Sequence, residues 1–82
     1  MEQVRNVYDY GKLMGLIKER YGTQEQFAEM LGLGRVSLSQ RLNNKLEFRQ
    51  SEIKSMIDLL EIPKEQIVSY FFMVVSTQKI KM

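Results

Sequence analysis

The residues between 35 and 43 carry the most informative side-chain chemistry of this 82-residue chain. They are long or small polar groups with one aliphatic and no acid among them: Arg35, Val36, Ser37, Ser39, Gln40 and Asn43. In a DNA major groove, arginine donates two hydrogen bonds to guanine, glutamine pairs with adenine and valine contacts a thymine methyl group. We therefore expect double-stranded DNA as the partner, with base edges contacted by Arg35, Val36, Ser39 and Gln40. The alternative is an ordinary solvated helix face.

A second group of residues is expected to contact DNA phosphates. Thr23 and Gln24 begin a helix, where free backbone N–H groups favour an anion. The others follow the base-reading residues or lie among them: Arg41, Asn43, Asn44 and Lys45. For Thr23 and Asn44, helix capping and turn formation explain the residue type equally well. Four basic residues and one acidic residue lie between 33 and 49, so this stretch has a local excess of three positive charges, although the whole chain carries only +2.

Composition argues against several other functions. The chain has no Cys and no His, so disulfides, Cys-based metal sites and the commonest general base are excluded. The acidic residues are scattered, and we expect no catalytic site, no metal, no other cofactor and no small-molecule ligand. No apolar run approaches the roughly 20 residues of a membrane span, and the first residues do not resemble a signal peptide. We expect a cytoplasmic protein with no membrane partner.

Two short helices must position these side chains. Thr23 can cap the first, whose apolar stripe comprises Phe27, Met30 and Leu31, and Gly32 ends it because glycine adopts positive φ at little cost. Ala28 is small where a second helix has to come close. That second helix starts at Arg35, and Leu38 and Leu42 hold it to the core.

Further helices are predicted on either side of this pair. Residues 10–20 form the first, capped by Asp9 and ended by Gly22, and Gly15 inside it indicates a close packing contact. Residues 50–60 form the next, and Pro63 begins a fifth. The predicted fold is all-α: one domain spanning 1–82, a compact bundle of about five helices with a central helix-turn-helix, a core at about 9–72 and a tail or dimerisation arm at 73–82.

The end of the chain is apolar beyond what a small core absorbs easily. A dimerisation surface is expected there, comprising Phe71, Phe72, Met73, Val74 and Val75. Residues 73–76 have high strand propensity. A strand there pairs either with the N-terminal arm at residues 4–8 or with a second subunit; the third alternative is a frayed tail.

The central pattern resembles the helix-turn-helix of phage Cro and repressor proteins. The matching residues are Gln24, Ala28, Gly32 and Leu38, followed by Asn43-Asn44-Lys45 where the family often has Asn-Gly-Lys. Over roughly residues 9–72 the chain is also similar to small phage regulators with Asp-Tyr near the start and Tyr-Phe-Phe after the last helix, here Asp9-Tyr10 and Tyr70-Phe71-Phe72. The chain departs from the family at Gly34, where Ser or Thr often caps the second helix, and at Arg41, where an aliphatic residue is usual.

The resemblance implies a transcriptional regulator, of repressor or Cro type, that reads operator half-sites as a homodimer, at least on DNA. A second class stays open, in which the helices form a protein-binding module such as an antirepressor or an antitoxin partner. An enzyme is not expected.

Overall fold

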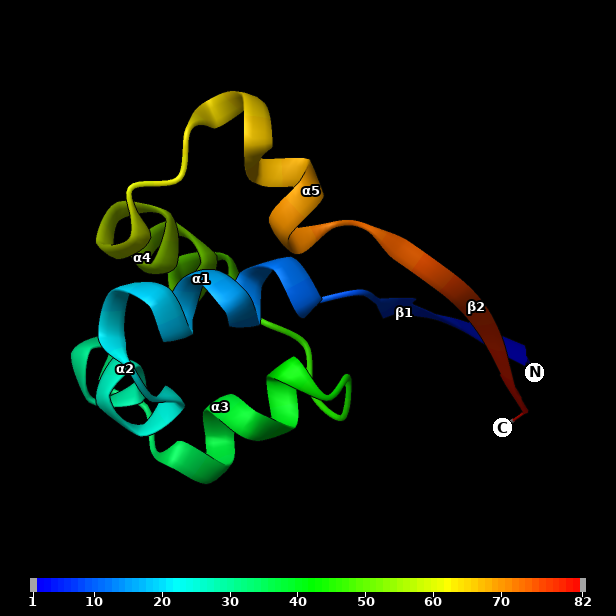
Figure 1. Cartoon of the computed structure of the whole chain (residues 1–82). Helices are drawn as coiled ribbons and strands as arrows, with labels where there is room; N and C mark the ends of the chain where they lie inside the picture. The colour runs from blue at the N-terminus through cyan, green and yellow to red at the C-terminus, as the bar shows by residue number, and fades with distance from the viewer. Residues whose placement is uncertain (1, 82) are drawn as a thin grey trace.

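In the part of the chain that the structure describes, five α-helices form the body and two strands form a ribbon that extends from it (Figure 1). The structure is a computed structural model that describes residues 2–81, with side chains described for residues 6–76. The elements in chain order are β1 (Glu2–Tyr8), α1 (Gly11–Tyr21), α2 (Gln24–Leu31), α3 (Arg35–Leu42), α4 (Gln50–Leu60), a 3-10 turn (Lys64–Gln66), α5 (Ile67–Phe71) and β2 (Val74–Lys81). The helical bundle is as expected, whereas the all-α description omits the sheet.

The two ends of the chain pair with each other. β1 and β2 run antiparallel, from Glu2 opposite Lys81 to Tyr8 opposite Val74, with an irregularity between Val7 and Tyr8. Of the three alternatives for the C-terminal segment, the structure therefore has the strand that pairs with the N-terminal arm. The ribbon projects from the body to one side, and both termini lie at its far end (Figure 1).

The core lies where α1, α2, α3, α4 and α5 converge. Its seven largest side chains with less than 2% exposure come from all five helices: Phe27, Phe71, Leu13, Ile17, Leu38, Met56 and Leu60. Ala28 is 1% exposed in α2, which packs against both α1 and α3. Close packing of α2 against these two helices therefore explains the small residue at this position.

Local signals set the ends of α2. Thr23 has extended backbone geometry, and its hydroxyl accepts a hydrogen bond from the Gln26 backbone N–H, so the predicted cap is confirmed. Gly32 ends the helix with φ 76°, in the left-handed region where glycine pays no steric cost. The backbone N–H of Leu33 then donates to the Ala28 carbonyl at 2.9 Å, which closes the turn before α3.

Two packing expectations are wrong. Gly15 has nothing within 4 Å of the position that a Cβ would occupy, so no close contact explains this glycine. Met30 is 58% exposed because α2 buries its other side, through Phe27 and Ala28. In the loop after α3, Leu46 is 48% exposed, whereas Phe48 packs against the core.

Within the described part of the chain, no helix combines the length and the apolar character needed to cross a membrane.

Candidate nucleic-acid interface

Helix α3 is held by contacts on one side, which leaves its other side free. Leu38 is fully buried and Leu42 is 3% exposed, and both contribute to the core shared with Phe27 of α2. Gly34 gives the helix no side-chain cap, and the Leu38 backbone N–H donates to the Gly34 carbonyl at 3.1 Å. At the other end, the Lys45 backbone N–H donates to the Gln40 carbonyl at 2.8 Å. These contacts fix the rotation of α3 about its own axis.

Arg41 lies inside the protein, which corrects the expected phosphate contact. Its side chain is 10% exposed, and its Nε atom lies 2.9 Å from Glu52 Oε1 in α4. Its Nη1 atom donates to the Ser37 carbonyl at 2.8 Å. The same Glu52 oxygen accepts the Arg49 backbone N–H at the start of α4. Arg41 therefore joins α3 to α4.

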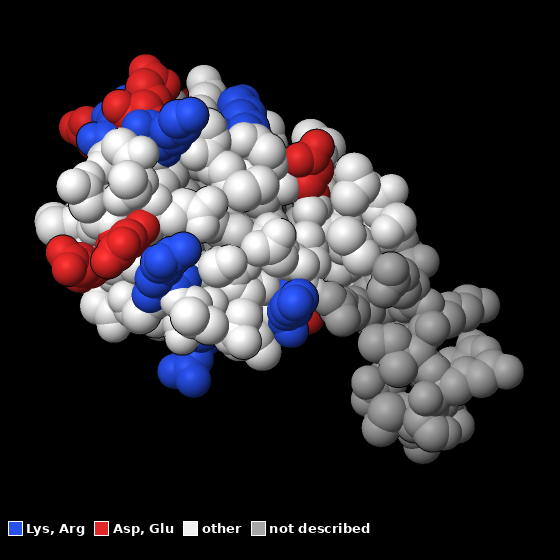
Figure 2. Space-filling model, turned by 60° about the horizontal axis from the view of Figure 1, so that its bottom comes forward, with Lys and Arg blue, Asp and Glu red and all other residues white. Residues whose placement is uncertain are grey.

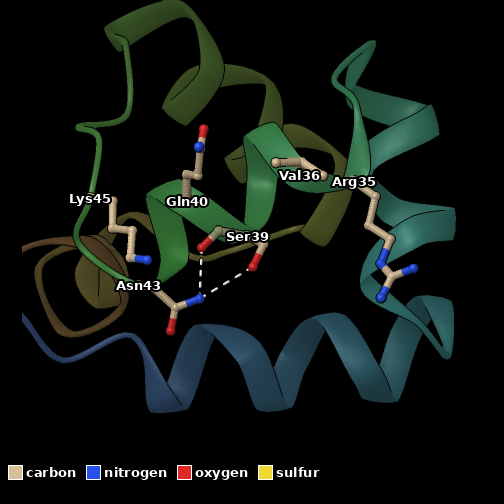
Figure 3. Close-up of a pocket in the computed structure, with 6 residues that line it drawn as sticks. All are labelled: Arg35, Val36, Ser39, Gln40, Asn43 and Lys45. Atoms are coloured by element: carbon tan, nitrogen blue, oxygen red, sulfur yellow. Dashed lines mark hydrogen bonds between the residues drawn. The ribbon is translucent and has the colours of Figure 1, made fainter.

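The free side of α3 gathers the residues expected to read bases. An open hollow of about 740 Å³ is lined by Arg35, Val36, Ser39, Gln40, Asn43 and Lys45. Figure 3 shows Arg35 and Val36 at one end of the helix, Asn43 and Lys45 at the other, and Ser39 between them. Val36 is 69% exposed, so packing does not explain an aliphatic residue there. All four predicted base-reading residues share one surface.

Asn43 and Ser39 are tied together on this surface. The Asn43 Nδ2 atom donates to the Ser39 carbonyl at 2.8 Å and to the Ser39 hydroxyl at 3.2 Å (Figure 3). These bonds hold the Asn43 amide close to the helix and use its Nδ2 atom. The remaining Oδ1 atom only accepts hydrogen bonds, so it cannot donate to a phosphate. Lys45 is exposed just beyond, and its ammonium group is therefore the stronger phosphate ligand at this end of α3.

Asn44 is occupied by the N-terminal arm, which corrects a second expected phosphate contact. Its Oδ1 atom accepts the Tyr8 backbone N–H at 2.8 Å, and its Nδ2 atom donates to the Tyr8 carbonyl at 2.9 Å. Its φ of 62° confirms the expected left-handed backbone after α3. Both ends of the amide are used, so Asn44 fastens the base of the ribbon to the end of α3.

An aromatic cluster supports the same junction. The Tyr10 ring lies 5.8 Å from the Tyr8 ring and 5.5 Å from the Phe48 ring, and Tyr10 is 6% exposed. Burial, with smaller contributions from the neighbouring Tyr8 and the Glu47 carboxylate, raises the pKa of Tyr10 to about 12. Tyr10 is a core residue that sequence reasoning missed, although it stands three and seven positions before the buried Leu13 and Ile17 and so continues their stripe at the start of α1.

The start of α2 places Gln24 beside a second, smaller hollow. This hollow of about 290 Å³ lies between α1 and α2 and is lined by Met14, Gly15, Ile17, Lys18, Gly22 and Gln24. Gln24 is partly exposed at the first turn of α2, and Thr23 is exposed but uses its hydroxyl for the cap. Gln24 therefore remains available at this helix start, whereas the Thr23 hydroxyl already serves the helix.

The charge on this side of the molecule is modest. Because Arg41 is paired with Glu52 inside the protein, the exposed basic residues from 33 to 49 are Arg35, Lys45 and Arg49, with Glu47 among them. In Figure 2, which turns the lower side of Figure 1 forward, basic side chains stand apart among uncharged and acidic ones. Specificity at such a surface has to come from hydrogen bonds and shape more than from a strong positive field.

The expected dimerisation residues divide into two kinds. Phe71 is 2% exposed and belongs to the core, so its inclusion in a contact surface was wrong. The other four are 45–61% exposed: Phe72, Met73, Val74 and Val75. They form an apolar surface at the base of the ribbon, together with Val68 of α5, which is 63% exposed.

Sequence comparison places the chain in a protein family. The family profile described as "Protein of unknown function (DUF739)" matches residues 6–74, and the chain belongs to this family. The matched residues include α1 through α5 and the α3 surface. No curated protein matches the chain.

One solved structure connects the family to phage regulation. The chain is similar to the modulator of repression (MOR) of the temperate bacteriophage TP901-1 from Lactococcus lactis, determined in solution. The two share 40% sequence identity and a TM-score of 0.70, over 79% of this chain and 88% of the other. A phage regulatory relative agrees with the resemblance to small phage regulators. Placement among Cro and repressor proteins stays a prediction.

Proposed function

We propose that this protein is a phage-type transcriptional regulator that binds double-stranded DNA in a sequence-specific manner, with α3 in the major groove. The observation that carries the proposal is the free side of α3. Four side chains suited to base edges share one open surface there, with a basic residue at either end. The helix is rigidly held from behind by Leu38, Leu42 and the Arg41–Glu52 pair.

The roles divide along the helix. Arg35 and Gln40 donate to base edges, Val36 contacts a thymine methyl group, and Ser39 bonds to a base directly or through water. Lys45 and Gln24 contact phosphates on either side of the groove, which fixes the position of α3 but carries no sequence information. Asn43 assists by keeping Ser39 in place. The pairing of α2 and α3 then acts as a helix-turn-helix, whose second helix enters the groove.

Specific recognition in a genome favours a homodimer, at least on DNA. One recognition helix contacts only a few base pairs, and two-fold dimers of such proteins bind half-sites about 34 Å apart. The apolar surface at the base of the ribbon, from Phe72 to Val75, is the part of this chain suited to that contact. Replacing Phe72 and Val75 by Ser should therefore weaken dimerisation in sedimentation on a two-fold DNA site.

A second candidate is a module that binds another regulatory protein, as an antirepressor does. The observation that favours it is the name of the similar TP901-1 protein, a modulator of repression, together with the modest charge around α3. Exposed Val36 and Met30 would suit a protein surface as well as a thymine methyl group. Under this alternative, α3 is still the contact surface but DNA is not the partner.

Selection of bound sequences from random double-stranded DNA separates the two. The purified chain should retain DNA, enrich one motif over successive rounds, and bind it less tightly as salt is raised. Retention of no DNA at low salt would overturn the proposal and leave the protein-binding alternative.

A further inference from the structure

The β1–β2 ribbon begins at the end of the α3 surface. Tyr8, the last residue of β1, is held by both hydrogen bonds to Asn44, two residues beyond α3. On the other strand, the Asp9 backbone N–H donates to the Met73 carbonyl at 2.8 Å, just before β2. The ribbon is therefore attached at its base to the body, and at Asn44 to the loop that leaves α3.

The far part of the ribbon differs in character from its base. The base is apolar, from Phe72 to Val75. Farther out, the strands carry three basic residues and one acidic residue: Arg5, Lys79, Lys81 and Glu2. The register sets Glu2 opposite Lys81, so Arg5 and Lys79 are the basic residues without an opposite charge directly across the ribbon. The outer strands therefore have a net positive charge and few apolar residues.

The length and direction of the ribbon suit a contact beside α3. Seven paired residues at about 3.3 Å each extend roughly 23 Å, which is longer than the major groove is wide, about 12 Å. In Figure 1 the far end of the ribbon descends to the level of α3. A duplex seated against the α3 surface as far as Lys45 would lie beside the base of the ribbon, because Asn44, the neighbour of Lys45, holds Tyr8 there.

We propose that the β1–β2 ribbon is a second DNA-contacting element, which binds the sugar–phosphate backbone flanking the groove occupied by α3. The proposal rests on the DNA-binding function proposed above. Charge complementarity selects this occupant, because phosphates are negative and the outer ribbon is positive. Asn44 is the positioning residue: its amide fixes the direction of the ribbon relative to α3 and so aligns the two contacts on one duplex.

The charges are tested first, by the dependence of affinity on salt in the full chain. Arg5→Gln and Lys79→Gln should each make the slope of log K against log salt shallower by about 0.9, on specific and on random DNA alike. The control is the pair Lys54→Gln and Lys64→Gln, which removes the same charge from α4 and the 3-10 turn and should leave the slope within half a unit.

The positioning role is tested by Asn44→Gly, which keeps the positive φ but removes both bonds to Tyr8. It should reduce the slope in the parent by one to two units and have no further effect in the Arg5→Gln, Lys79→Gln background. Equal effects of Asn44→Gly in the two backgrounds would overturn the positioning role.

The failure of this inference is distinct from failure of the proposed function. If the parent binds DNA and the ribbon variants keep its salt slope, the ribbon does not contact DNA. If the variants instead lose dimerisation in sedimentation, the ribbon serves a second copy of the chain, and the inference is again overturned. If the parent binds no DNA, both proposals fail.

Discussion

Arg41 has a different role in the structure from the one that its position in the sequence suggested. By sequence it counts as one of the positive charges of the DNA-binding stretch, yet its guanidinium is paired with Glu52 and the Ser37 carbonyl in the interior. In the structure it fixes α3 on α4, and under the proposed function it supports recognition in that way rather than by touching phosphate. Sequence alone does not distinguish these roles, because the partner Glu52 lies eleven residues away on another helix.

Replacing Arg41 by Met should reduce the free energy of unfolding by about 3–5 kcal/mol, since it leaves the Glu52 carboxylate buried without its partner. The matched control combines Arg41→Met with Glu52→Gln, which removes the unpaired charge but keeps an acceptor for the Arg49 N–H. The double variant should recover most of the loss in urea denaturation. If Arg41→Met unfolds at the same urea concentration as the parent, the interior pair is not as described.

Tyr10 predicts a loss of stability in alkali. Its pKa is about 12 in the folded protein against 10 in the unfolded chain, so folding is favoured fully below pH 10. The contribution is lost as the pH rises from 10 to 12, by up to about 3 kcal/mol. Tyr10→Phe keeps the ring contacts with Tyr8 and Phe48. It should flatten this part of the pH profile of the free energy of unfolding, which is measured by urea denaturation at each pH. A profile as steep as that of the parent would assign the loss to another group.

Within single helices and turns, the sequence predicted the features that depend on neighbouring residues. The ends of α2 followed from Thr23 and Gly32, and the turn after α3 from Asn44, because capping and positive φ depend on neighbouring residues. Packing was less predictable: Met30 lies on the apolar stripe of α2 but outside its buried side. The four residues expected to read bases do share a surface. Asn44 was wrongly expected to contact DNA, because its real partner Tyr8 lies 36 positions away in the sequence.

Enlarging two small residues on neighbouring helices should change the stability of the protein in opposite directions. Gly15→Ala should stabilise the protein by about 1 kcal/mol, because it sits in the middle of α1 with open space around a new Cβ. Ala28→Leu should destabilise it by about 1–3 kcal/mol, because the 1% exposed site between helices has no room. Thermal unfolding followed by circular dichroism measures both. A stabilised Ala28→Leu would mean that α2 is packed more loosely than described.

The whole molecule combines a helical body with a ribbon built from both ends of the chain. That ribbon was the least predictable part of the fold, since its strands are 65 residues or more apart in sequence and neither has a strict alternation of apolar and polar residues. The body holds α3 by its buried side, and the ribbon is fastened where α3 ends. Under the two proposals above, the α3 surface and the ribbon act together on one duplex.

The most direct measurement for this account is the affinity of Gln40→Ala and Arg35→Ala for a selected DNA site and for a scrambled duplex at one salt concentration. Each should lose about 1–3 kcal/mol on the selected site and little on the scrambled one. Lys45→Ala is the control and should weaken both equally. Equal losses on the two duplexes for Gln40→Ala and Arg35→Ala, or unchanged affinity, would contradict the claim that α3 reads DNA sequence.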